Sequence, residues 1–145
     1  MIKAEDLRIG DLVKINENCS LKEGVISYIT EIRTRGIFEK EDCVKVKHFD
    51  SDWEFGVRCC NINPIPLTRE ILTLNGWSLV KRRIDEDNFE WHVYSHEDNC
   101  VNIQYYPQSD SFSAFFVDHE LCEIKYVHDL QHILWALGED ANLTI

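Results

Sequence analysis

The sequence has little positive charge. Its 15 Lys and Arg residues are outnumbered by 26 Asp and Glu residues, which leaves a formal net charge of −11. Nucleic acids and anionic membranes attract proteins through an excess of cations, so this balance argues against a broad interface with either partner. The exceptions are two local basic clusters, Arg33 with Arg35 and Lys81 with Arg82 and Arg83, which are most simply interpreted as solvated strand ends and turns.

The sequence also lacks the short motifs of common enzymes. Its six glycines are scattered, and none belongs to the phosphate-binding patterns G-x-x-x-x-G-K or G-x-G-x-x-G. The nucleophile motif G-x-S-x-G is absent as well. We therefore predict a protein that is not an enzyme and that binds no nucleotide and no other cofactor.

Membrane spans and structural zinc sites have no support either. No apolar run approaches the roughly 18 residues that cross a bilayer, and the six cysteines contain no C-x-x-C pair. The first six residues have neither an apolar signal core nor a transit-peptide composition. We expect a cytoplasmic protein without membrane contact, whose cysteines are free thiols and mostly small buried hydrophobic residues.

The first part of the chain has the pattern of a small antiparallel sheet. Short runs with alternating apolar residues occupy 12–15, 25–32, 43–49 and 53–59, and turn residues separate them. Gly10 and Asp11 precede the first run as a turn, and Gly56 suggests a bulge in the fourth. This spacing predicts a curled antiparallel sheet or an SH3-like barrel.

Pro64 and Pro66 mark an internal boundary, because proline cannot donate a hydrogen bond to a sheet. Beyond it, Thr68 is a good N-cap for a short helix over 69–75 that ends at Gly76. Four alternating runs follow at 77–84, 89–95, 100–106 and 112–117, then a brief strand at 121–124, as in an antiparallel meander. We predict an α+β fold with an SH3-like lobe at 1–63 and an α+β lobe at 64–145, or one domain containing both.

A helix is predicted near the carboxy terminus, over about 124–138. Val127, Leu130 and Leu134 recur at helical spacing, and Gly138 is a plausible end. We expect this helix to cover the sheet face that carries five apolar side chains: Phe89, Trp91, Val93, Val101 and Ile103. The last five residues form a short tail that could add an edge strand.

The same helix carries His128 and His132, whose spacing of four residues places both imidazoles on one flank. Zinc hydrolases bind their metal with such a pair, in H-E-x-x-H. Here Asp129 stands where the general-base Glu would be. A third ligand would have to come from elsewhere in the chain. A zinc-hydrolase site is therefore the secondary interpretation. The main one places the two histidines at the edge of the helix-sheet interface.

Tyr105 and Tyr106 are adjacent on a predicted strand, so they cannot both face the core. The outward one is the predicted site of an exposed aromatic contact. The other aromatic residues are expected to supply core area.

Three segments resemble a family of small uncharacterised proteins from gut bacteria, their prophages and mobile elements. They are EDLRIGDLV at 5–13, PIPLTREIL at 64–72 followed by NGW, and IKYVHDLQH at 124–132 followed by WALGE. The resemblance implies no activity, substrate or cofactor. The family pattern has either His or Asn at the position of His132, which makes the second imidazole optional.

The leading functional prediction is a non-enzymatic module of a phage or mobile element that binds a protein partner through an exposed sheet edge or aromatic patch. The alternative is an SH3-like nucleic-acid-binding accessory protein that uses the two basic clusters. The third is an acidic inhibitor that mimics nucleic acid. The sequence identifies no particular partner.

Overall fold

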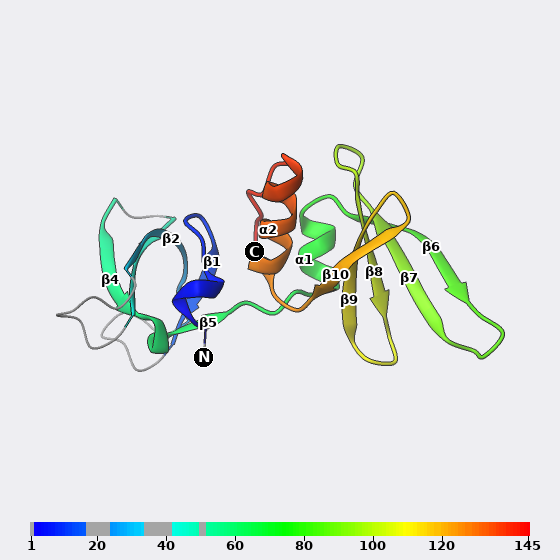
Figure 1. Ribbon diagram of the computed structural model, residues 1–145, viewed down its shortest axis with the longest axis horizontal. Coiled ribbons are helices and arrows are strands. Elements are labelled where there is room, and N and C mark those ends of the chain that lie inside the picture. The colour runs from blue at the N-terminus through cyan, green and yellow to red at the C-terminus, as the bar shows by residue number, and fades with distance from the viewer. Residues whose placement is uncertain (1, 17–23, 34–41, 50–51) are drawn as a thin grey trace. The chain divides into compact units, whose positions relative to one another are not determined.

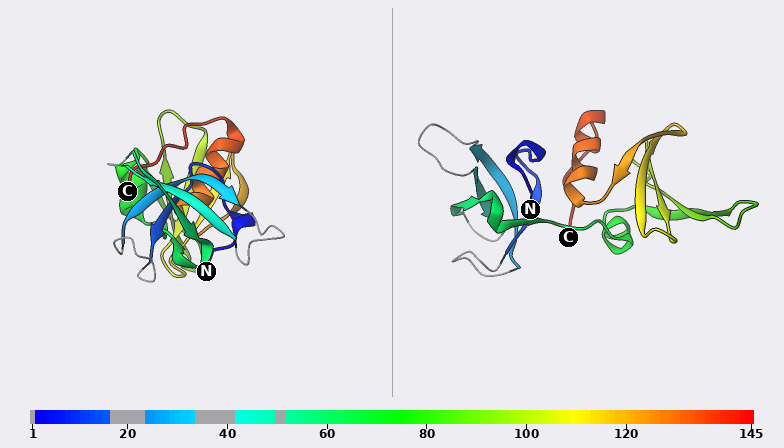
Figure 2. Two further views of the ribbon diagram at one scale, coloured as in Figure 1. Left: turned by 90° about the vertical axis from the view of Figure 1, so that its left-hand side faces the viewer. Right: turned by 60° about the horizontal axis from the view of Figure 1, so that its bottom comes forward.

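The computed structural model describes residues 2–16, 24–33, 42–49 and 52–145. Within these residues the chain has mixed α and β structure, and ten strands form two antiparallel sheets of five strands each. It divides into two compact units, Met1–Ile65 (unit 1) and Pro66–Ile145 (unit 2), two residues beyond the predicted boundary (Figures 1 and 2). No helix in the described part of the chain is long and apolar enough to cross a membrane.

Unit 1 is built almost entirely from strands, in the order β4-β3-β2-β1-β5. Gly56 pairs with Lys45 in unbroken register, so the predicted bulge at Gly56 is wrong; the register shifts instead between Ile29 and Glu31. The elements in chain order are η1 (Ala4–Asp6), β1 (Leu12–Ile15), β2 (Ile26–Arg33), β3 (Cys43–His48), β4 (Glu54–Arg58), η2 (Cys59–Asn61) and β5 (Ile62–Pro64).

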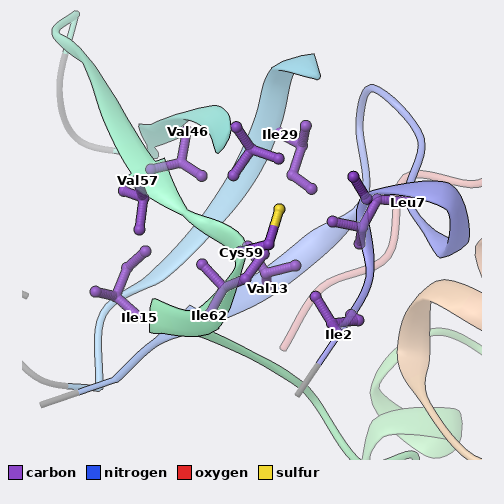
Figure 3. Packing of buried hydrophobic residues seen from close by; sticks show 11 residues of the cluster. Ile2, Leu7, Val13, Ile15, Ile29, Val46, Val57, Cys59 and Ile62 are labelled. Carbon is purple, nitrogen blue, oxygen red and sulfur yellow. The ribbon is translucent and has the colours of Figure 1, made fainter. Parts of the chain in front are cut away.

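The core of unit 1 consists of small and branched apolar side chains on the inner face of its sheet (Figure 3). Val13, Ile29 and Ile62 are fully buried there. β-Branched residues suit this position because they pack well on a pleated surface. Cys59 belongs to the same cluster, and burial raises the pKa of its thiol to about 11, which makes it a packing residue rather than a nucleophile.

Unit 2 places its five strands in sequential order, β10-β9-β8-β7-β6, with two helices on one side of the sheet (Figure 1). All neighbouring strands are antiparallel. The elements are α1 (Arg69–Leu74), β6 (Ser78–Ile84), β7 (Glu90–Ser95), β8 (Val101–Tyr106), β9 (Ser111–Phe116), β10 (His119–Ile124) and α2 (Val127–Leu137).

Local sequence signals set the ends of both helices. The hydroxyl oxygen of Thr68 accepts a hydrogen bond from the backbone N–H of Ile71 at 3.3 Å and caps α1. At the start of α2, the Asp129 carboxylate accepts hydrogen bonds from the backbone N–H groups of Lys125 and Tyr126 at 3.0 and 2.9 Å. The helix ends at Gly138, which adopts the left-handed conformation with φ 77°.

The predicted orientation of β7 is wrong. Cross-strand pairing places His92 opposite Tyr105 and Tyr94 opposite Ile103, so His92 and Tyr94 are the buried residues of this strand. Trp91 and Val93 lie on the opposite face and are partly exposed, and Phe89 is exposed. Both alternations of β7 contain large side chains, and the register with β8 decides between them.

The carboxy-terminal tail does not add a strand to either sheet. It docks within unit 2 through side chains of the two helix regions. The Asn75 side chain donates to the Thr144 carbonyl and accepts from its N–H at 2.7 and 2.6 Å. The amide of Gln131 donates to the Ala141 carbonyl at 3.1 Å, and the side chains of Ala141 and Leu143 are buried.

Candidate functional site

The sheet of unit 2 has one face that neither helix covers. Both helices lie on the other side (Figure 1), where Val101, Ile103 and Ala114 are fully buried. Because side chains alternate along a strand, their sequence neighbours point away from the helices. We call this surface the open face; its central residues are Trp91, Val93, Gln104, Tyr106, Ser113 and Phe115, with Phe89 at its margin.

Three aromatic side chains meet on the open face. The ring of Phe89 lies 5.7 Å from that of Tyr106 and 6.4 Å from that of Trp91, measured between centroids. Phe89 is exposed, and Trp91 and Tyr106 are partly exposed. Tilted rings at such distances form a stable cluster, and large rigid rings with little conformational entropy to lose are well suited to binding.

The hydroxyl of Tyr106 gives this cluster a polar end. It donates a hydrogen bond to the side-chain oxygen of Gln104 at 3.1 Å. Partial burial, with a smaller effect from the nearby Glu120 carboxylate, raises the pKa of Tyr106 above its ordinary value of 10. The phenol therefore stays protonated at neutral pH. Of the two tyrosines considered from the sequence, Tyr106 is the outward one.

Tyr105 has a structural role instead. Its side chain is buried, and its hydroxyl donates to the Asp110 carboxylate at 2.9 Å. The Arg69 guanidinium of α1 lies over the ring, 5.1 Å from the centroid, a cation–π contact that ties the helix to the sheet. Desolvation, together with the hydrogen bond to Asp110, raises the pKa of Tyr105.

Charge changes sign across the open face. One row of cross-strand neighbours begins with Lys81 on β6, passes through Val93, Gln104 and Ser113, and ends with Glu123 on β10. Arg83 pairs with Trp91 at the β6 edge. In a different row, Glu120 at the β10 edge pairs with Phe115, which pairs with Asn102. The face therefore has a basic edge, an aromatic centre and an acidic edge.

The two basic clusters differ in whether their cations form ion pairs. Arg33 is in unit 1, where its guanidinium forms an ion pair with Glu31 at 2.6 Å; Arg35 lies outside the described residues. Within the described residues, Lys81, Arg82 and Arg83 form no ion pair, and all three side chains are exposed. The unpaired cations of unit 2 thus border its aromatic cluster.

His128 and His132 are packed against aromatic rings. His128 is only 3% exposed and stacks on Tyr126 at 5.5 Å with an interplanar angle of 9°. His132 stacks on Trp135 at 6.0 Å, and the two imidazoles meet edge-on at 5.7 Å. No group of three or more His, Cys, Asp or Glu side chains suited to a metal ion occurs in the part of the chain that the structure describes.

Asp129 has a structural task that accounts for its position between the two histidines. Its Oδ2 atom accepts both backbone hydrogen bonds at the start of α2. A carboxylate near a helix N-terminus is also favoured by the helix dipole. The residue that takes the place of the zinc-hydrolase base is therefore the helix cap.

A shallow groove of about 560 Å³ lies on the helix side of unit 2, beside the β6 edge. It is lined by Tyr94 of β7 and by residues of α1, including Thr73 and the exposed Leu74. Leu79 of β6, which pairs with the lining residue Tyr94, is 40% exposed. The edge of β6 therefore has apolar surface on its helix side as well as aromatic surface on its open side.

Reasoning from the sequence missed Phe89 and Trp91 as surface residues because it assigned them to the core. The signal that could have placed them is the register between β7 and β8, which aligns Tyr94 with the apolar Ile103. Comparisons of the chain with protein-family models, with curated proteins and with solved structures found no match. The chemistry of the open face is therefore the basis on which a function can be proposed for this chain.

Proposed function

We propose that this chain is a non-enzymatic protein-interaction module of a phage or mobile element, and that unit 2 binds its partner on the open face. The observation that carries the proposal is the cluster of Phe89, Trp91 and Tyr106 on a sheet face without a covering helix. Clustered aromatic residues beside cations are typical of the few side chains that contribute most to a protein interface.

The polar groups of the open face support a protein partner. The partly exposed Gln104 lies beside the aromatic rings, and charges of opposite sign lie at the two edges of the face. Such a surface fits a partner that has both apolar and charged side chains. A nucleic acid would meet the three cations of β6 but also a unit with five Lys and Arg residues against fourteen Asp and Glu residues, a net charge of −9.

For unit 1 we propose an SH3-like fold that serves as the scaffold of the module. Two features support this assignment: the strand order β4-β3-β2-β1-β5, and the single 3₁₀ turn η2 between β4 and β5. Lys3, Arg33, Lys45 and Lys47 of unit 1 form ion pairs with carboxylates of the same unit. This pairing favours a structural over a nucleic-acid-binding use of unit 1.

The test is capture of partners from a lysate of the encoding organism with three forms of the full chain: wild type, Trp91→Ala and Trp135→Ala. The two substitutions remove the same side chain, from the open face and from the helix α2 respectively. We expect one protein to be retained by wild type and Trp135→Ala but lost with Trp91→Ala. Equal retention by all three forms would contradict the site. Retention of nucleic acid alone, released by moderate salt, would contradict the protein-binding function.

A further inference from the structure

We infer that the edge strand β6 receives an extended, acidic segment of the partner protein as a sixth strand of the unit 2 sheet. This inference rests on the proposed function and names the chemistry of the segment that is bound. It is carried by three observations on β6: its position in the sheet, its exposed apolar side chains and its unpaired cations.

β6 is an edge strand with one free side. It is the last strand in the order β10-β9-β8-β7-β6 and, among the strands that the structure describes, pairs only with β7. All seven of its residues are exposed, and the β6–β7 hairpin projects from the rest of the sheet (Figures 1 and 2). Alternate backbone N–H and C=O groups of such a strand point away from the sheet, where an added strand can bond to them.

The side chains of β6 suit a partner strand. Leu79, Val80 and Ile84 are between 40% and 65% exposed, an unusual apolar content for a solvated strand. Lysine alone on an edge strand protects a sheet from unwanted pairing. The three exposed apolar side chains of β6 work against such protection, because they favour association once a partner strand is aligned.

The charges of β6 select the partner. Lys81 and Arg83 lie on the open face, because they pair with Val93 and Trp91, while Arg82 pairs with His92 and points to the helix side. An added strand with acidic residues could therefore reach a cation on either face. A second copy pairing through its own β6 would bring cations close to cations, which is unfavourable. The charge complement is an acidic segment of a different protein.

Backbone hydrogen bonds would supply affinity in this mode, and the alternating side chains would supply selectivity. Partner residues next to the open face would contact the Trp91 side of β6. Those on the helix side would lie near Leu79, which pairs with Tyr94, a residue that lines the groove. The strongly negative charge of the rest of unit 2 would repel the same acidic segment from other sites, which confines binding to β6.

The experiment uses the ¹⁵N-labelled full chain and four probes followed by NMR: a seven-residue peptide of alternating Glu and Val, its Lys-for-Glu counterpart, an acidic peptide N-methylated at alternate residues, and oligothymidine. We expect the acidic peptide alone to shift the amide signals of 78–84 and to slow their hydrogen exchange. N-Methylation should abolish binding because it removes the donors of the added strand. Salt should weaken the binding of the unmethylated acidic peptide.

Variants complete the test. Lys81→Glu with Arg83→Glu should weaken the acidic peptide about tenfold or more, because two attractive charges become repulsive. Lys125→Glu, a charge reversal in unit 2 outside β6, serves as the matched control and should leave binding nearly unchanged. Equal binding of the N-methylated peptide, or no shift at millimolar peptide, would overturn strand addition. Binding of oligothymidine in place of the peptide would also overturn it. If strand addition is overturned in one of these ways, loss of partner capture with Trp91→Ala would still support the proposed function.

Discussion

The two units use their cations in opposite ways. Unit 1 has ten Lys and Arg residues against twelve Asp and Glu residues, and cations such as Arg33, Lys45 and Lys47 pair with neighbouring carboxylates. Unit 2 has only five cations among fourteen carboxylates, yet Lys81, Arg82 and Arg83 pair with none in the part of the chain described. Cations left unpaired in an acidic unit are available to a partner.

The units also differ in how they bury their sheets. Unit 1 gathers its buried apolar residues into one cluster of strands and 3₁₀ turns (Figure 3), while Phe49, Trp53 and Phe55 are exposed. Unit 2 needs its helices to cover one sheet face and leaves aromatic side chains on the other. Both units therefore have exposed aromatic side chains, and those of unit 2 lie beside cations that form no ion pair within the described residues.

The strongest test of this comparison removes a helix contact from unit 2. Leu134 of α2 is fully buried, so Leu134→Ala should lower the free energy of unfolding of unit 2 by roughly 2–5 kcal/mol. Leu137 is 36% exposed on the same helix, and Leu137→Ala should cost about 1 kcal/mol or less. Denaturant titration followed by NMR signals from each unit measures both effects.

Separate cores predict that the effect of Leu134→Ala stays in unit 2. Signals from Ile29 and its neighbours in unit 1 should keep their denaturation midpoint, since they belong to a different cluster. A single shared transition, shifted equally for both units, would break the comparison, because it would mean that the two sheets unfold as one cooperative body.

A smaller effect is expected from the cap of α2, an element without a counterpart in unit 1. Asp129→Ala removes the acceptor of two backbone hydrogen bonds and should cost about 1 kcal/mol of unit 2 stability. Asp129→Asn keeps a side-chain oxygen and should cost less. Thermal unfolding followed by far-UV circular dichroism compares the two variants. Equal melting temperatures for wild type and Asp129→Ala would refute the capping role.

Local sequence signals predicted the elements well. The Thr68 cap and the Gly138 end lie where the sequence placed them, and the predicted strands overlap the observed ones, because caps and alternation are short-range properties. The facing of Trp91 and the docking of the tail on Asn75 could not be predicted. Both depend on pairing between distant segments, which a single strand or tail does not encode.

The same limit applied to the candidate site. The sequence predicts Tyr106 as one of two alternatives for an exposed aromatic contact, and it identifies the basic cluster of 81–83 without its cross-strand neighbours. That Arg83 lies beside Trp91, and Lys81 beside Val93, follows only from the β6–β7 register, which includes a shift between Leu79 and Lys81. An irregularity of this kind inverts the facing of every later residue of the strand, and so decides which cations share a face with the aromatic cluster.

The smallest effect concerns the paired charges of unit 1. It tests whether the cations of this unit differ from those of β6 in being held by carboxylates. Hydrogen bonds from Arg33 first, and then from Lys45, lower the pKa of Glu31 from 4.5 to about 2. A carboxyl whose folded pKa is depressed stabilises the fold above its unfolded pKa, and that contribution is lost as the pH falls from about 4.5 through 2.

NMR titration of the Glu31 carboxyl should therefore show a midpoint near 2 in the wild type. Arg33→Gln should raise this pKa toward 4.5. Lys3→Met, which removes a cation that pairs with Glu5 in the same unit, should leave it unchanged. A wild-type midpoint near 4.5 would mean that solvent screens the unit 1 pairs completely, so that their cations are as available to a partner as those of β6.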